Sequence, residues 1–246
     1  MQTEICAVVS GKGGVGKSTL AFYLADVLAG GKSRSLILDF NVGIRGVDVF
    51  FGAAGDIVYD LGDVLEGRCS VYHSALIPCV HNRNYFAMAA PSDLFYHFDF
   101  DKLYNLSVEL KKDFNYIFID APSAISNALI SAVSLCDRAI IVTTPDPLSV
   151  SAAAKIGKYI VSSDTATSHV LINGVNFNSR TSPLISDFDE IIDAVSHPLI
   201  GVVPYDATLY GVLMKGRLLP RNSKLSRAVY SIARRYNKDS VPLVVG

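Results

Sequence analysis

Residues 5–30 read ICAVVSGKGGVGKSTLAFYLADVLAG, which is an apolar run, a glycine-rich loop and a helical pattern in succession. The loop holds Gly11, four further residues and then Gly16-Lys17-Ser18, the spacing of a phosphate-binding loop. Its glycines let the backbone turn tightly and point N–H groups at phosphate oxygens, and the positive end of the following helix favours the same anion. The stretch predicts an α/β fold that binds a nucleoside triphosphate.

Two side chains of this loop have predicted roles beyond shape. Lys17 would reach the β- and γ-phosphates, and the Ser18 hydroxyl would ligate Mg²⁺. The residues that we expect to contact the nucleotide here are Gly11, Lys12, Gly13, Gly14, Val15, Gly16, Lys17, Ser18 and Thr19.

Short apolar runs alternate with helical patterns along the whole chain. The expected strands are Ile5–Ser10, Ser35–Phe40, Tyr85–Ala90, Tyr116–Asp120, Ala139–Thr144, His169–Asn173 and Leu199–Val203. The expected helices are Lys17–Ala29, Leu103–Lys112, Ala124–Leu135, Leu148–Val161, Phe188–Val195 and Ser223–Tyr236. This alternation is typical of crossover connections. It predicts one domain over residues 1–246, a doubly wound, mainly parallel sheet flanked by helices, of the P-loop NTPase class.

The composition is that of a soluble cytoplasmic protein. Of the 246 residues, 50% are hydrophobic and 18% charged, yet no apolar run approaches the ~18 residues that span a bilayer. The net charge of −1 indicates neither a nucleic acid nor a membrane as partner. Cys6 and Cys136 lie in apolar surroundings and are expected to be core residues, and no cysteine or histidine spacing indicates zinc.

Two carboxylates come at the ends of predicted strands, where ligands bind in such sheets. Asp120 ends the apolar run Tyr116–Asp120, and Asp39 ends the run that begins at Ser35. Mg²⁺ prefers oxygen ligands and keeps several waters, so carboxylates beside a phosphate loop suit it. We expect Ser18, Asp39 and Asp120 to form the metal site.

The second lysine of the loop, Lys12, completes the sequence KGGVGKS and resembles the signature of the MinD/ParA family of deviant Walker ATPases. Later segments also resemble that family, most closely MinD proteins: LILDFNVGIRGVDVFFG (36–52), VYDLGDVLEG (58–67), YIFIDAPSAI (116–125), IIVTTPDPLSV (140–150) and GVVPYD (201–206). The resemblance implies ATP and Mg²⁺ as cofactors. It also implies that Lys12 contacts ATP across the interface of an ATP-dependent homodimer, and that Asn173, Pro204 and Asp206 lie near adenine.

One residue departs from the family pattern at a position that matters for chemistry. Members usually have Asp-x-Asp where this chain has Asp39-Phe40-Asn41, and the second aspartate positions or polarises the attacking water. Asparagine carries no charge and takes up no proton. We therefore expect ATP binding with slow or absent hydrolysis. The candidate catalytic residues are Lys12, Lys17, Asp39, Asn41 and Asp120.

The resemblance implies an ATPase switch that positions a cell-division, flagellar or pilus apparatus through an unidentified regulatory or cargo protein. Two alternatives stay open: a non-hydrolysing ATP-bound scaffold, and a ParA-type DNA-partitioning ATPase. Ala152-Ala153-Ala154 stands where MinD proteins commonly have charged partner-binding residues, so we expect different partners.

MinD proteins generally carry a C-terminal amphipathic membrane anchor, and we see no such pattern after Lys238. The basic residues of 215–238 leave peripheral association with anionic lipid open, and DNA binding open but not favoured. They include Lys215, Arg217, Arg221, Lys224, Arg227, Arg234 and Arg235. The interpretation that we favour for Ser223–Tyr236 is a last core helix with a solvated basic face.

Overall fold

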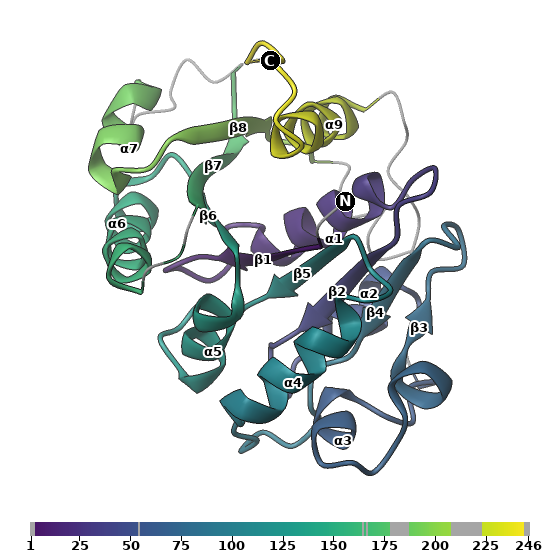
Figure 1. The fold of residues 1–246 in the computed structure, drawn as a ribbon. Helices are drawn as coiled ribbons and strands as arrows, with labels where there is room; N and C mark the ends of the chain where they lie inside the picture. Colours follow the sequence, from purple (N-terminus) through teal and green to yellow (C-terminus); the bar gives the residue numbers. More distant parts are fainter. Residues whose placement is uncertain are drawn as a thin grey trace.

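Eight strands form one sheet in the computed structural model, which describes residues 3–53, 55–163, 165, 167–177, 187–207 and 223–243 (Figure 1). The strands are β1 (Glu4–Val9), β2 (Ser35–Asp39), β3 (Ile77–Pro78), β4 (Tyr85–Met88), β5 (Tyr116–Asp120), β6 (Arg138–Thr143), β7 (Thr167–Val175) and β8 (Leu199–Pro204). Their order is β3-β4-β2-β5-β1-β6-β7-β8, and all neighbours are parallel except β3 and β4. The predicted fold class is confirmed.

Helices cover both faces of this sheet (Figure 1). They are α1 (Lys17–Leu28), α2 (Gly46–Phe50), α3 (Leu61–Leu65), the π-helical turn η1 (Val71–Ala75), α4 (Phe100–Leu110), α5 (Asn127–Leu135), α6 (Pro147–Ser162), α7 (Phe188–Val195) and α9 (Lys224–Tyr236). Helices α1, α2 and α9 pack on one face, and α3 to α7 pack on the other.

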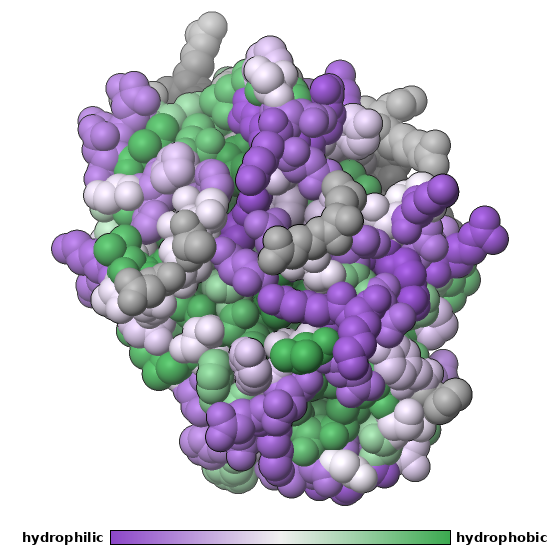
Figure 2. All heavy atoms as spheres, viewed as in Figure 1, coloured by the Kyte–Doolittle hydropathy of each residue, from purple (hydrophilic) through white to green (hydrophobic). Residues whose placement is uncertain are grey.

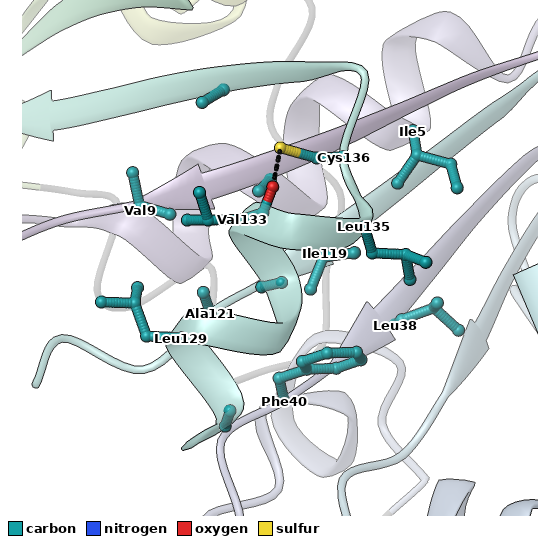
Figure 3. Packing of buried hydrophobic residues seen from close by; sticks show 14 of the residues in the cluster. Ile5, Val9, Leu38, Phe40, Ile119, Ala121, Leu129, Val133, Leu135 and Cys136 are labelled. Atoms are coloured by element: carbon teal, nitrogen blue, oxygen red, sulfur yellow. Dashed lines mark hydrogen bonds between the residues drawn. The ribbon is translucent and has the colours of Figure 1, made fainter. Parts of the chain in front are cut away.

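Alternate residues of each strand enter different cores, because successive side chains of a strand point to opposite faces. In β1, Ile5, Ala7 and Val9 belong to the core under α3 to α7, whereas Cys6 and Val8 belong to the core under α1 and α9. Figure 3 shows part of the first core. The central strands are thus covered on both sides, which is why they read as continuous apolar runs.

Capping residues set where three helices begin. The Asp99 carboxylate accepts a hydrogen bond from the Lys102 N–H, so α4 begins at Phe100 and not at Leu103 as predicted. The Ser126 hydroxyl accepts one from the Leu129 N–H, which places the start of α5 at Asn127, three residues later than predicted. Asp146 does the same for α6, where Pro147 occupies the first turn.

The segment between β2 and β4 holds four elements that we did not predict: α2, α3, η1 and β3. None exceeds five residues, so no hydrophobic period can develop. Tertiary contacts and caps hold them instead. The Phe22 ring stacks on Phe50 of α2 with centroids 4.1 Å apart, and Asp60 and Asp63 form a reciprocal capping box on α3.

Helix α9 agrees with the interpretation of a core helix. Six of its side chains are buried against α1 and β8: Leu225, Ala228, Val229, Ile232, Ala233 and Tyr236. Lys224, Arg227 and Arg234 lie on the exposed face, and Figure 2 shows hydrophilic side chains over this part of the surface. The predicted basic residues Lys215, Arg217 and Arg221 lie outside the described residues.

Two of the cysteines lie in the core of the described part of the chain. Cys6 and Cys136 are buried free thiols, as expected for core residues, and the Cys136 thiol donates to the Val133 carbonyl (Figure 3). No helix in the described ranges has the length and apolar character needed to cross a bilayer. Among the same residues, no group of three or more His, Cys, Asp or Glu side chains could hold a metal ion by itself.

Candidate nucleotide-binding site

The phosphate loop connects β1 to α1 at the carboxyl edge of the sheet. Gly16 has a φ of 86°, a left-handed conformation that a side chain would strain. Gly11 lies so close to α6 that a Cβ atom would collide with the Ala152 carbonyl. The geometry therefore requires glycine at both positions. The close approach of Gly11 to Ala152 also places the loop against the first turns of α6.

The amino end of α1 lacks a side-chain cap. The first N–H groups of a helix have no partner inside the helix, and together with the helix dipole they attract an anion. In a phosphate loop, the anion takes the place of the capping side chain. This end of α1 therefore suits a phosphate group.

Lys17 is the first residue of α1, and its ammonium group contacts a buried carboxylate. Its Nζ atom lies 2.6 Å from Asp120 Oδ1 and 3.4 Å from Ser18 Oγ. The Lys17 side chain is 5% exposed and that of Asp120 is 0% exposed. The structure thus brings Asp120 together with Lys17 and Ser18, although 103 positions separate Asp120 from Lys17 in the sequence.

Asp39 lies directly beside Asp120, since the two residues are paired in the register of β2 and β5. Both carboxylates are fully buried. Burial raises the pKa of Asp39, and the neighbouring Asp120 raises it further. The Asp39 carboxylate accepts hydrogen bonds from the backbone N–H groups of Asn41, at 2.9 Å, and Gly46, at 2.7 Å.

The Asn41 amide bridges these two carboxylates. Its Nδ2 atom donates to Asp39 Oδ1 at 2.8 Å and to Asp120 Oδ2 at 2.7 Å. Hydrogen bonds to ionised acceptors are stronger than neutral ones. An aspartate at this position would have no such donor, so the departure from the family pattern changes how the carboxylates are held together.

The raised pKa of Asp39 predicts a dependence of stability on pH in the ligand-free protein. A carboxyl whose pKa is higher in the folded state takes up a proton on folding, so its stabilisation is present at low pH and lost as the pH rises through the raised pKa. Asp39→Asn removes this titration. We expect its unfolding free energy relative to wild type to rise by about 1–2 kcal/mol between about pH 5 and about pH 8.

Urea denaturation without nucleotide or Mg²⁺ measures this difference. Asparagine at position 39 has one oxygen where aspartate has two, so its NH₂ group would face a backbone N–H donor such as that of Gly46. The resulting loss of stability does not vary with pH. The change with pH is therefore the readout, and a constant difference across that range would refute the assignment.

Lys12 contacts the residue that caps the amino end of α6 in its own chain. Its Nζ atom lies 3.1 Å from Asp146 Oδ1, and the Lys12 side chain is 42% exposed. Although burial alone would raise it, hydrogen bonds from Ser149, Thr144 and Lys12 hold the pKa of Asp146 below its ordinary value. Sequence reasoning missed Asp146, whose signal is an aspartate three residues before Ser149, the pattern of a helix cap.

The three residues predicted near adenine lie at the ends of β7 and β8. Asn173 donates its amide to the Val15 carbonyl at 2.7 Å, so in this structure it supports the phosphate loop. Pro204 is buried and paired with Val175, and Asp206 follows at the carboxyl end of β8, partly exposed. The contact between Asn173 and the loop was not predicted, because nothing in the sequence links residues 158 positions apart.

The donor set at this site suits Mg²⁺. A hydroxyl and two carboxylates lie around Lys17, all of them hard oxygen ligands, and the two buried carboxylates outnumber the lysine paired with them. Phosphate oxygens and waters would complete the coordination, as is usual for this ion.

Comparison with known proteins agrees with this geometry. Residues 6–219 match the model of the CobQ/CobB/MinD/ParA nucleotide binding domain. The septum site-determining protein MinD of Bacillus subtilis is 34% identical over 257 residues, covering 98% of this chain and 92% of the relative.

Solved structures of MinD proteins are also similar to this chain. MinD in the MinC:MinD complex of Aquifex aeolicus superimposes with a TM-score of 0.89 at 28% identity and 99% coverage of both chains. MinD of Pyrococcus horikoshii, solved with Mg-ADP, gives 0.83 at 24% identity, covering 96% of each chain, which bears on the fold alone. The family uses ATP and Mg²⁺, as predicted. This chain belongs to the MinD/ParA family of P-loop ATPases and is similar to MinD.

Proposed function

We propose that this protein is an ATP-dependent dimerising switch of the MinD type that takes part in positioning a cell-division, flagellar or pilus apparatus, and that it hydrolyses ATP slowly. The relatives are named septum site-determining proteins, which favours the division apparatus. The observation that carries the proposal is the group formed by Lys17, Ser18, Asp39 and Asp120 beside the uncapped end of α1.

In this proposal the residues change partners when nucleotide binds. Lys17 leaves Asp120 for the β- and γ-phosphates, and the N–H groups of the loop and of α1 hold the phosphate oxygens. Ser18, Asp39 and Asp120 would hold Mg²⁺, which would supply positive charge that neutralises the phosphates. Asn173, Pro204 and Asp206 stay our candidates for the base side of the site.

Slow hydrolysis follows from Asn41. A positioned proton acceptor contributes about 10²- to 10⁴-fold to reactions that need one, and an amide cannot accept the proton. The Asn41 amide also donates hydrogen bonds to the carboxylates of Asp39 and Asp120. Phosphoryl transfer depends more on positioning and charge, so some hydrolysis can remain.

Dimerisation is supported by apolar side chains at the edge of the sheet that carries the phosphate loop. Each follows the carboxyl end of a parallel strand, and each is largely exposed: Ile44 (73%), Leu94 (71%), Ile125 (67%) and Leu148 (74%). We take these four side chains as the candidate contacts with a second copy of the chain. Lys12 lies at the same edge, where it could reach the nucleotide of a second copy.

The outer face of α6 is the candidate surface for a regulatory or cargo protein. It begins beside the phosphate loop, where Asp146 holds Lys12 and Ala152 packs on Gly11. The small side chains at 152 and 154 replace the charged ones common in MinD, so we expect a partner other than the usual regulators. We place the protein in the cytoplasm, with peripheral attachment to the membrane as the alternative that MinD relatives suggest.

A non-hydrolysing scaffold is the second candidate, and Asn41 favours it. Single-turnover phosphate release from ATP with excess protein separates the two. A slow release of one phosphate per site supports the switch, whereas tight ATP binding with no release above the uncatalysed rate supports the scaffold. Failure to bind ATP would refute both.

A further inference from the structure

We propose that the Asn41 amide replaces part of the contribution of Mg²⁺ to nucleotide binding, so that this protein binds ATP with less dependence on Mg²⁺ than it would with aspartate at position 41. The inference rests on the proposed binding of ATP and deepens it. It concerns the charge balance of Asp39 and Asp120.

The two carboxylates need compensation because neither is accessible to water. Asp39 and Asp120 are 0% exposed and paired in register on adjacent strands. In the described part of the chain, Lys17 is the cation in contact with them, at 2.6 Å from Asp120. An unpaired buried carboxylate is costly, and two carboxylates side by side repel each other.

Nucleotide binding removes this cation from the pair. When Lys17 turns to the phosphates, Asp120 loses its ion pair while a polyanion arrives at the same edge of the sheet. In an ordinary site of this kind, Mg²⁺ would supply the positive charge that offsets this repulsion. Without it, Asp39 and Asp120 would have to be stabilised by neutral donors.

Asn41 supplies those donors independently of Lys17. Its Nδ2 atom donates to Oδ1 of Asp39 and to Oδ2 of Asp120, whereas Lys17 uses Oδ1 of Asp120. The movement of Lys17 therefore leaves both Asn41 contacts intact.

The short segment that carries Asn41 is itself fixed. The Asn41 and Gly46 N–H groups both bond Asp39, and the Ile44 N–H donates to the Asn41 carbonyl at 2.9 Å. Arg45 pairs with the buried Asp60 at 3.3 Å, and Asp60 also accepts the Ser92 N–H at 3.0 Å. The amide is held in place before any nucleotide arrives.

Aspartate at position 41 would add negative charge to Asp39 and Asp120 instead of hydrogen-bond donors. It would replace two donated hydrogen bonds with a third carboxylate, and carboxylates only accept when ionised. Asp39 would keep the backbone N–H groups of residues 41 and 46, whereas Asp120 would lose the Asn41 amide and depend on a cation for its compensation. The ratio of the ATP dissociation constant in excess EDTA to that in excess Mg²⁺ should therefore be larger in Asn41→Asp than in wild type.

Calorimetric titration of the full chain with the slowly hydrolysed analogue ATPγS measures this ratio. We expect the Asn41→Asp ratio to exceed the wild-type ratio by about tenfold or more, which corresponds to ~1.4 kcal/mol. Asn105→Asp, the same change on the exposed surface of α4, is the matched control and should keep the wild-type ratio. Asn41→Ala, which removes the donors without adding charge, should give an intermediate ratio and serves if the aspartate variant fails to fold.

Equal ratios in wild type, Asn41→Ala and any folded Asn41→Asp, or a wild-type ratio larger than theirs, would overturn the inference while leaving ATP binding established. If wild type binds ATPγS in neither condition, the proposed function itself fails. The two failures are thus distinguishable in one set of titrations.

Discussion

Replacing Asn41 with aspartate should raise the rate of ATP hydrolysis by about 10- to 100-fold at saturating Mg²⁺ and ATP. The variant restores a carboxylate that can accept a proton and orient the attacking water. It also removes the amide that now bonds Asp39 at 2.8 Å and Asp120 at 2.7 Å. We expect less than the full effect of a general base, since phosphoryl transfer depends mostly on positioning and charge.

Phosphate release under single-turnover and steady-state conditions measures this change. Asn105→Asp again serves as control and should hydrolyse ATP at the wild-type rate. MinD of Bacillus subtilis, measured alongside, gives the rate of a relative at 34% identity. If wild type already matches that relative, or if Asn41→Asp is no faster than wild type, Asn41 does not limit hydrolysis.

Replacing Lys17 with alanine should have two large effects, because Lys17 pairs with Asp120 in the ligand-free protein and is expected to hold phosphate in the bound one. Removing one partner of a buried ion pair typically destabilises a protein by about 3–5 kcal/mol. Loss of a buried contact with the phosphates should also weaken ATP binding by at least about 100-fold.

A double variant separates these effects. Lys17→Ala combined with Asp120→Asn removes the uncompensated carboxylate, so stability should recover in large part while ATP binding stays lost. Lys102→Ala, which breaks an exposed pair with Glu66, should leave both quantities nearly unchanged. Wild-type ATP affinity in Lys17→Ala would contradict the assignment of the phosphate loop.

The sequence was most informative where local pattern and tertiary structure agree. The central strands are buried on both faces, so β1, β2, β5 and β6 appear as apolar runs, and β5 has its predicted bounds. The phosphate loop was predictable because its chemistry requires glycines at fixed spacing. Asp39 and Asp120 were predictable as neighbours because parallel strands bring their carboxyl ends to one edge.

The parts that could not be predicted depend on contacts between distant residues. Helix α2 is held by Phe22 and by the bond from the Gly46 N–H to Asp39, and neither leaves a periodic signal. The Asn173 contact with Val15 joins β7 to the phosphate loop across most of the chain. The bridging role of Asn41 needed the register of β2 and β5 as well as the path of the chain after Asp39.

The central claim, an ATP-dependent dimer, is tested most directly by size-exclusion chromatography with light scattering in ADP and in ATP. Wild type should be monomeric with ADP and dimeric with ATP. Lys12→Ala, whose side chain contacts Asp146 at the exposed edge of the site, should bind ATP and stay monomeric. A monomer in every nucleotide, or a Lys12→Ala variant that dimerises like wild type, would contradict the account.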